Sequence, residues 1–73
     1  MENIVVIEKR RKLGEINGEN IFVWELHEVM RISQFEEWCM DRGYTAPYLS
    51  EKTNRNLIDT NLEATLWNVD ERA

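Results

Sequence analysis

The chain has few features that would support a large, cross-linked or membrane-embedded structure. Its 73 residues allow at most one small domain. The single cysteine, Cys39, excludes a framework of internal disulfides and indicates a reducing compartment. No apolar run is longer than that at residues 4–7, which is too short to cross a bilayer, and residues 1–12 do not resemble a signal peptide. We therefore expect a cytoplasmic protein with no membrane association.

Residues that bind metals or perform catalysis are also scarce. His27 and Cys39 are the only soft metal ligands, whereas a zinc site needs about four ligands. Ser33 and Ser50 are better explained as helix caps than as nucleophiles, because no catalytic motif surrounds them. So short a chain also has little room to enclose and support an active site. We expect no enzyme activity, no cofactor and no metal.

Charge is present in abundance, but it is unevenly distributed. The formal net charge is −5, yet residues 1–12 carry +2 because Lys9, Arg10, Arg11 and Lys12 outnumber two glutamates. Residues 13–73 therefore sum to −7. An acidic chain does not favour direct binding to DNA or RNA, whose phosphates select lysine and arginine.

The first third of the chain predicts β-structure. Residues 3–8 are rich in β-branched side chains and indicate a short strand or an extended tail. Residues 13–16 and 19–24 flank Asn17-Gly18. Because a type I′ turn needs positive φ at both central residues, Asn-Gly between two such segments predicts a β-hairpin.

The middle of the chain predicts two short helices. Leu26, Val29 and Met30 have the i, i+3, i+4 spacing of one helix face, which predicts a helix over 25–31. Ser33 and Glu36 match a capping box before a second helix over 34–42, and Gly43 suits its C-terminal cap. The pair would form a helix–turn–helix.

The last third is less regular. Ser50 would cap a helix through residue 58, and the capping-box pattern at 60–63 favours a further helix over 61–69, with a strand over 64–69 as the alternative. We predict an α+β fold in which an N-terminal hairpin packs on two short helices and a C-terminal helix or strand closes the core. Residues 1–12 would form a basic strand or tail, residues 13–69 the single domain, and residues 70–73 a frayed end.

A family resemblance covers residues 14–42. Residues 14–30 read Gly-Glu-Ile-Asn-Gly-Glu-Asn-Ile-Phe-Val-Trp-Glu-Leu-His-Glu-Val-Met, and a Phe-x-x-Trp segment follows at 35–38. This stretch resembles the N-terminal region of phage antirepressor-type domains, the antirepressor and baculovirus-repeated-ORF group. In size and acidity the chain is also similar to short phage proteins that bind host RNA polymerase. The resemblance implies a phage-type regulator of transcription.

Together these patterns indicate a small regulator that binds a protein of the transcription apparatus, either RNA polymerase or a repressor. A helix–turn–helix DNA-binding regulator is one alternative, although Glu36, Glu37 and Asp41 would face the phosphates. An acidic DNA mimic that inhibits a nuclease or restriction system is another. Basic side chains, the strand before them and an aromatic loop are the candidate contacts. We expect the partner-binding residues to be Val6, Ile7, Lys9, Arg10, Arg11, Lys12, Tyr44 and Tyr48.

Overall fold

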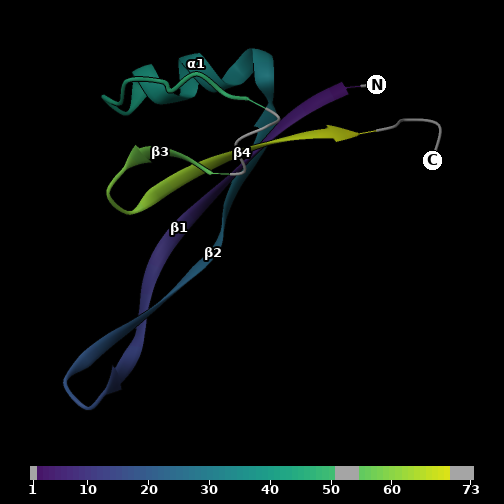
Figure 1. Cartoon of the computed structure of the whole chain (residues 1–73). Helices are drawn as coiled ribbons and strands as arrows, with labels where there is room; N and C mark the ends of the chain where they lie inside the picture. The colour runs from purple at the N-terminus through teal and green to yellow at the C-terminus, as the bar shows by residue number, and fades with distance from the viewer. Residues whose placement is uncertain (1, 51–54, 70–73) are drawn as a thin grey trace.

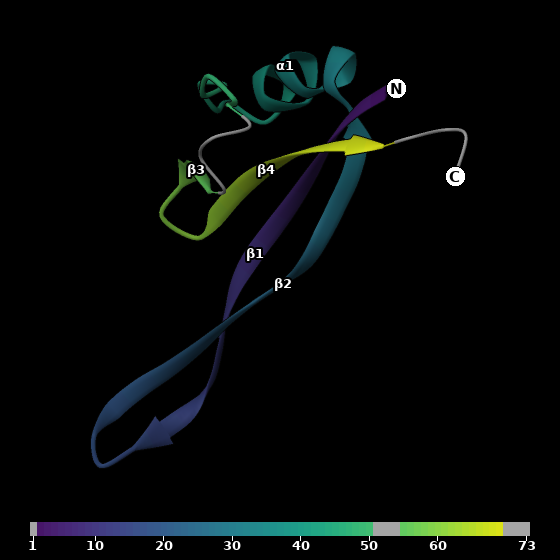
Figure 2. The same ribbon diagram turned by 45° about the vertical axis from the view of Figure 1, so that its right-hand side comes forward.

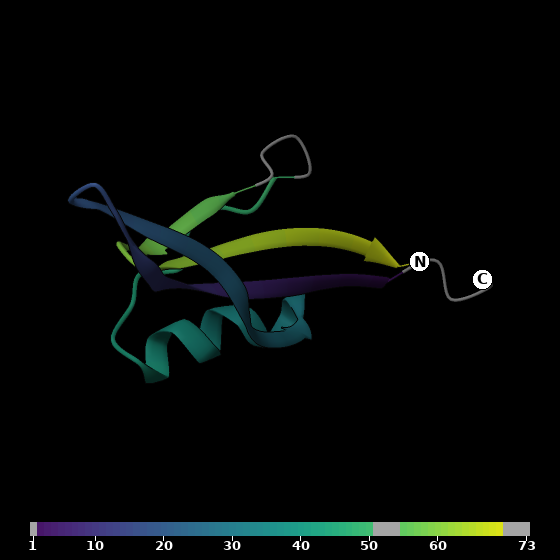
Figure 3. The same cartoon turned by 90° about the horizontal axis from the view of Figure 1, so that it is seen from below.

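The structure, a computed structural model, describes residues 2–50 and 55–69. Its elements follow in the order β1 (Glu2–Ile16), β2 (Glu19–Arg31), α1 (Ile32–Asp41), β3 (Asn56–Asp59) and β4 (Leu62–Val69). The strands form one antiparallel sheet in the order β2-β1-β4-β3. The helix lies against one face of this sheet (Figure 1, Figure 3). The predicted frayed end at 70–73 lies outside the described residues.

The hairpin predicted around Asn17-Gly18 is confirmed, but it is much longer than expected. Asn17 has φ 52° and Gly18 has φ 81°, so both central residues take the positive φ that a type I′ turn requires. Strands of 15 and 13 residues flank the turn. The far end of this hairpin, residues 10–24, projects away from the helix and from β3 and β4 as a two-stranded arm (Figure 1, Figure 2).

The helix predicted over 25–31 is wrong, because these residues continue strand β2. The pairing register explains the misleading spacing. Ile7 lies opposite Glu28 and Glu8 lies opposite Leu26, so His27 is the extra residue of a β-bulge. The bulge places Leu26 and Val29 on the same sheet face although they are three residues apart, and this imitates a helical period.

The second predicted helix exists as α1, although its N-terminal cap differs from the prediction. The helix begins at Ile32, and the Arg31 N–H donates to the Gln34 Oε1 at 3.3 Å, so Ser33 is not the cap. The predicted glycine cap is confirmed, since Gly43 has φ 77°. The Gly43 N–H donates to the Met40 carbonyl at 3.1 Å and the Tyr44 N–H to the Cys39 carbonyl at 2.8 Å, which is a Schellman motif.

The C-terminal third is also extended. Residues 56–59 form β3 where a helix was predicted, and the strand alternative is correct for β4. Residues 51–54, the first half of the predicted third helix, lie outside the described residues. Thr60 and Asn61 form the turn between β3 and β4 and cap no helix. The prediction of an α+β fold with a helix–turn–helix is therefore wrong, because the described chain is a four-stranded sheet with one helix.

The core lies between α1 and the sheet. Among the described residues, the fully buried apolar side chains come from the two central strands and the helix. They are Val5, Ile7, Phe35, Cys39, Leu62 and Ala64. In the register, Ile7 lies directly opposite Ala64, which fixes the sheet face that α1 covers. With so few buried side chains, the free energy of unfolding depends strongly on each of them.

The cap at Gly43 generates a test of this fold. Because φ at Gly43 is 77°, Gly43→Ala should lower the free energy of unfolding by about 1 kcal/mol or more. Gly14→Ala is the matched control. Gly14 does not have a positive φ, and a Cβ there would contact nothing within 4 Å. Urea denaturation of both variants measures the difference, and equal stability of the two would contradict the capping geometry.

Candidate functional site

The sheet presents two different faces. One face carries Val5 and Ile7 and is covered by α1. Because side chains alternate along a strand, Ile4, Val6 and Glu8 point to the opposite face. We call this opposite face the open face, since no described element lies across it (Figure 3). It continues onto the arm through Arg10 and Lys12 of β1 and their partners Trp24 and Phe22 on β2, up to the register shift between Lys12 and Gly14.

The open face exposes several large apolar side chains. They come from β2, β3 and β4. In the pairing register they lie on either side of Val6 and Glu8, which occupy the centre of the open face on β1. Leu26 is 67% exposed and Trp67 is 56% exposed. The other exposed members are Phe22, Val29 and Leu57, with Trp24 half-buried beside them. Exposed apolar and aromatic side chains gathered on one face are typical of interaction surfaces.

Arginine side chains lie over the aromatic rings of this face. The Arg10 guanidinium carbon is 3.7 Å from the centre of the Phe22 ring, and that of Arg55 is 5.8 Å from the Trp24 ring. Arg55 also pairs with Glu63, whose carboxylate it approaches at 3.3 Å. Glu63 is only 8% exposed, and the ion pair with Arg55 compensates for the removal of its carboxylate from water. Arginine and tryptophan are the residue types most often found as binding hot spots.

The predicted basic segment is divided between the two faces. Arg10 and Lys12 belong to the open face, because they lie opposite Trp24 and Phe22 in the register. Lys9 and Arg11 point to the other side. Lys12 and Arg11 form exposed ion pairs with Glu15 and Glu25, each at 3.0 Å.

The four basic side chains therefore do not form a single patch. Arg10 is the member that contacts an aromatic ring of the open face.

The other predicted contact residues are dispersed. Ile7 is fully buried, whereas Val6 is half-buried on the open face. Strand β1 is paired with both β2 and β4 along residues 4–9, so it offers no free edge there for a partner strand. Tyr44 stacks on Trp38 with ring centres 6.3 Å apart, while Tyr48 is 90% exposed in the loop after α1. The structure brings Tyr44 and Lys9 together in the lining of one pocket, whereas Tyr48 lines a different pocket beside α1.

The aromatic residues of the open face were missed as candidates, although the sequence contains a signal for them. Phe22 and Trp24 are two residues apart within the predicted strand 19–24, which places them on one face. Phe22 is 41% exposed on the arm and does not belong to the core. Trp67 follows the same alternation along β4, but the preference for a helix over 61–69 obscured it.

Groups with reactive chemistry are few in the part of the chain that the structure describes. His27 is exposed at the bulge, with its ring edge toward Trp38 at 6.3 Å between centres. Within residues 2–50 and 55–69, no cluster of three histidine, cysteine or acidic side chains is arranged to hold a metal ion. None of the helical structure in the same ranges combines the length and apolar character needed to cross a membrane.

Cys39 is fully buried in the core, as its position on the apolar helix face predicts. Burial raises the pKa of the thiol, and the positive charge of Arg42 lowers it by a smaller amount. A raised pKa keeps the thiol protonated, so it is a poor nucleophile at neutral pH.

A thiol-labelling experiment tests this burial. Cys39 of the folded chain should react with a disulfide reagent at least about 100-fold more slowly than the urea-unfolded chain, because reaction requires opening of the core. The folded form favours the protonated thiol, so the free energy of unfolding should also fall as pH rises above the ordinary thiol pKa. Labelling of the folded chain at the rate of the unfolded chain would contradict the burial.

Comparison with protein-family models, curated proteins and solved structures finds no match to this chain. The resemblance of residues 14–42 to antirepressor-type domains therefore remains a prediction. The function proposed below is therefore inferred from the geometry and chemistry of the open face.

Proposed function

We propose that this chain is a non-enzymatic protein-binding module that acts through the open face and the arm. The observation that carries the proposal is the uncovered sheet face. The helix covers one side of the sheet, and Leu26, Val29 and Trp67 lie exposed on the other. Burying such side chains against a partner is favourable by about 25 cal/mol for each Å² of apolar surface removed from water.

The charge of the open face supports a partner with an acidic surface around an apolar centre. The face carries Arg10, Lys12 and Arg55, against the carboxylates of Glu8 and Glu63. Glu63 is paired with Arg55 and Glu15 with Lys12, so among the described residues Arg10 is the cation of this face on the arm that no carboxylate neutralises, although the whole chain is −5. Complementary charge steers association and fixes orientation.

A protein of the transcription apparatus, RNA polymerase or a repressor, is the partner that we propose on the basis of the sequence resemblance. The helix–turn–helix motif on which the DNA-binding alternative depended is not formed, since residues 25–31 form a strand, so we do not favour that alternative. The DNA-mimic alternative predicts a different captured protein, a nuclease, and serves as an outcome of the experiment below.

Arg10 and Arg11 provide a matched pair of variants for testing this surface. Both are arginines on the same strand of the arm, but Arg10 lies over Phe22 on the open face and Arg11 pairs with Glu25 on the other. Arg10→Ala should weaken partner binding by about tenfold or more, which corresponds to about 1.4 kcal/mol. Arg11→Ala should change the affinity by less than about threefold.

The measurement has two stages. Affinity capture from lysate of the source cells, or of their host, with mass spectrometry identifies the partner. Titration calorimetry of the purified partner then compares the two variants, with circular dichroism to verify the fold. Equal losses from both variants would show that net charge alone drives binding and would contradict the proposal. Recovery of a nuclease that competes with DNA would favour the mimic.

A further inference from the structure

A second potential binding site lies at the outer edge of strand β2, away from the arm. In the strand order β2-β1-β4-β3, β2 is an edge strand of 13 residues. No described strand pairs with its outer side, and it contains no proline. A long unprotected edge of this kind is a template for an added strand.

The ladder pattern shows which backbone groups face this edge. The Arg10 N–H donates to the Asn61 carbonyl at 2.9 Å, toward β4, so the odd-numbered residues of β1 are those that bond toward β2. Val5 and Ile7 lie opposite Met30 and Glu28. Glu28 and Met30 therefore bond inward, toward β1. Because the direction alternates along a strand, the N–H and carbonyl of Val29, which lies between them, point outward to the free edge.

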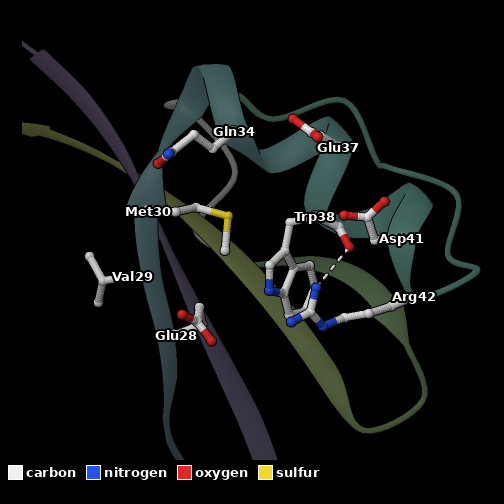
Figure 4. A pocket seen from close by; sticks show the side chains of 8 residues that line it. All are labelled: Glu28, Val29, Met30, Gln34, Glu37, Trp38, Asp41 and Arg42. Carbon is white, nitrogen blue, oxygen red and sulfur yellow. Dashed lines mark hydrogen bonds between the residues drawn. The ribbon is translucent and has the colours of Figure 1, made fainter.

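A pocket of about 310 Å³ adjoins this part of the edge, between β2 and α1. Val29 lines the pocket, although Figure 4 shows its side chain pointing to the other side of the strand from Trp38. Glu28 and Met30 point toward the pocket, and α1 supplies the facing wall (Figure 4). A groove between an edge strand and a helix has the shape that receives an extended peptide.

The charges around the pocket favour a basic occupant. The lining includes the carboxylates of Glu28, Glu37 and Asp41. The one cation in the lining, Arg42, is held over the Trp38 ring at 4.2 Å and donates to the Trp38 carbonyl at 3.3 Å (Figure 4).

A buried donor in the pocket lacks an acceptor. The Trp38 Nε1 is shielded from solvent and has no hydrogen-bond partner among the described residues. Leaving such a donor unsatisfied is unfavourable, and tryptophan N–H groups usually find a partner when buried. A carbonyl of a peptide lying in the groove would supply the acceptor once the side chains that shield this atom move aside.

We propose that the groove between β2 and α1 binds an extended basic peptide segment, which adds to the sheet beside β2. Its backbone would pair with the outward N–H and carbonyl of Val29, and its lysine or arginine side chains would meet Glu28 and Glu37. One of its carbonyls would accept the Trp38 indole N–H. This site uses the backbone of Val29 and side chains on the helix side of the sheet, whereas the open face uses side chains on the other side, so either proposal can fail without the other.

The probe is an acetylated and amidated hexapeptide of alternating lysine and valine, titrated into the ¹⁵N-labelled full chain. The expected result is a set of NMR shift changes at residues 28–30 and at the Trp38 indole N–H, with nuclear Overhauser contacts from the peptide backbone to Val29. The same peptide with alternate backbone nitrogens methylated keeps its charge but loses donors. It should bind about tenfold more weakly.

Two neighbouring glutamates on α1 provide matched protein variants. Glu37 lines this pocket, whereas Glu36 lines a different one beside Tyr48. Glu37→Gln should weaken peptide binding by about threefold, and the double variant with Glu28→Gln by about tenfold, while Glu36→Gln should have little effect. No shift at 1 mM peptide, equal binding of the methylated peptide, or equal effects of Glu36→Gln and Glu37→Gln would each overturn the proposal.

Discussion

The packing of α1 against the two central strands is the contact on which the rest of this structure depends. Phe35 and Cys39 of the helix meet Val5 and Ile7 of β1, and Ala64 of β4 completes the layer. A helix of ten residues has one apolar stripe, so it can cover one side of the sheet and leaves the other side to solvent. The small core and the exposed face therefore have the same physical origin.

The open face, in turn, determines which residues are available to a partner. The alternation of β1 buries Ile7, presents Val6, and separates Arg10 from Arg11 although they are adjacent in sequence. Arg10 lies over Phe22, and this contact gives the arm a cation held against an aromatic surface. A binding surface of this kind needs no enclosed pocket, which suits a chain of 73 residues.

Local signals in the sequence were sufficient for the hairpin turn and the C-terminal cap of α1, and insufficient for the N-terminal caps and the sheet. Asn17-Gly18 and Gly43 need positive φ, a requirement that is set locally, and both were predicted correctly. Strand β2 was mistaken for a helix beyond residue 24 because the bulge at His27 shifts the alternation, and a bulge is specified by pairing with β1. Strand β4 depends in the same way on long-range pairing, which propensity alone cannot reveal.

The candidate surface could be predicted only in part for the same reason. Clustered cations were visible in the sequence, but the rings that accompany Arg10 lie on a different strand and become neighbours through the register. The groove beside β2 requires both the strand order and the helix direction, and neither can be read from Glu28 or Trp38 in isolation.

The central claim is that one sheet face of the isolated chain is exposed to solvent, and solvent paramagnetic relaxation of the methyl groups tests it most directly. With a soluble gadolinium reagent, the methyl groups of Leu26, Val29 and Leu57 should relax strongly, and those of Val5 and Ile7 should be protected. Protection of Leu26 and Val29 equal to that of Ile7, in a dilute sample of the free chain, would contradict the account.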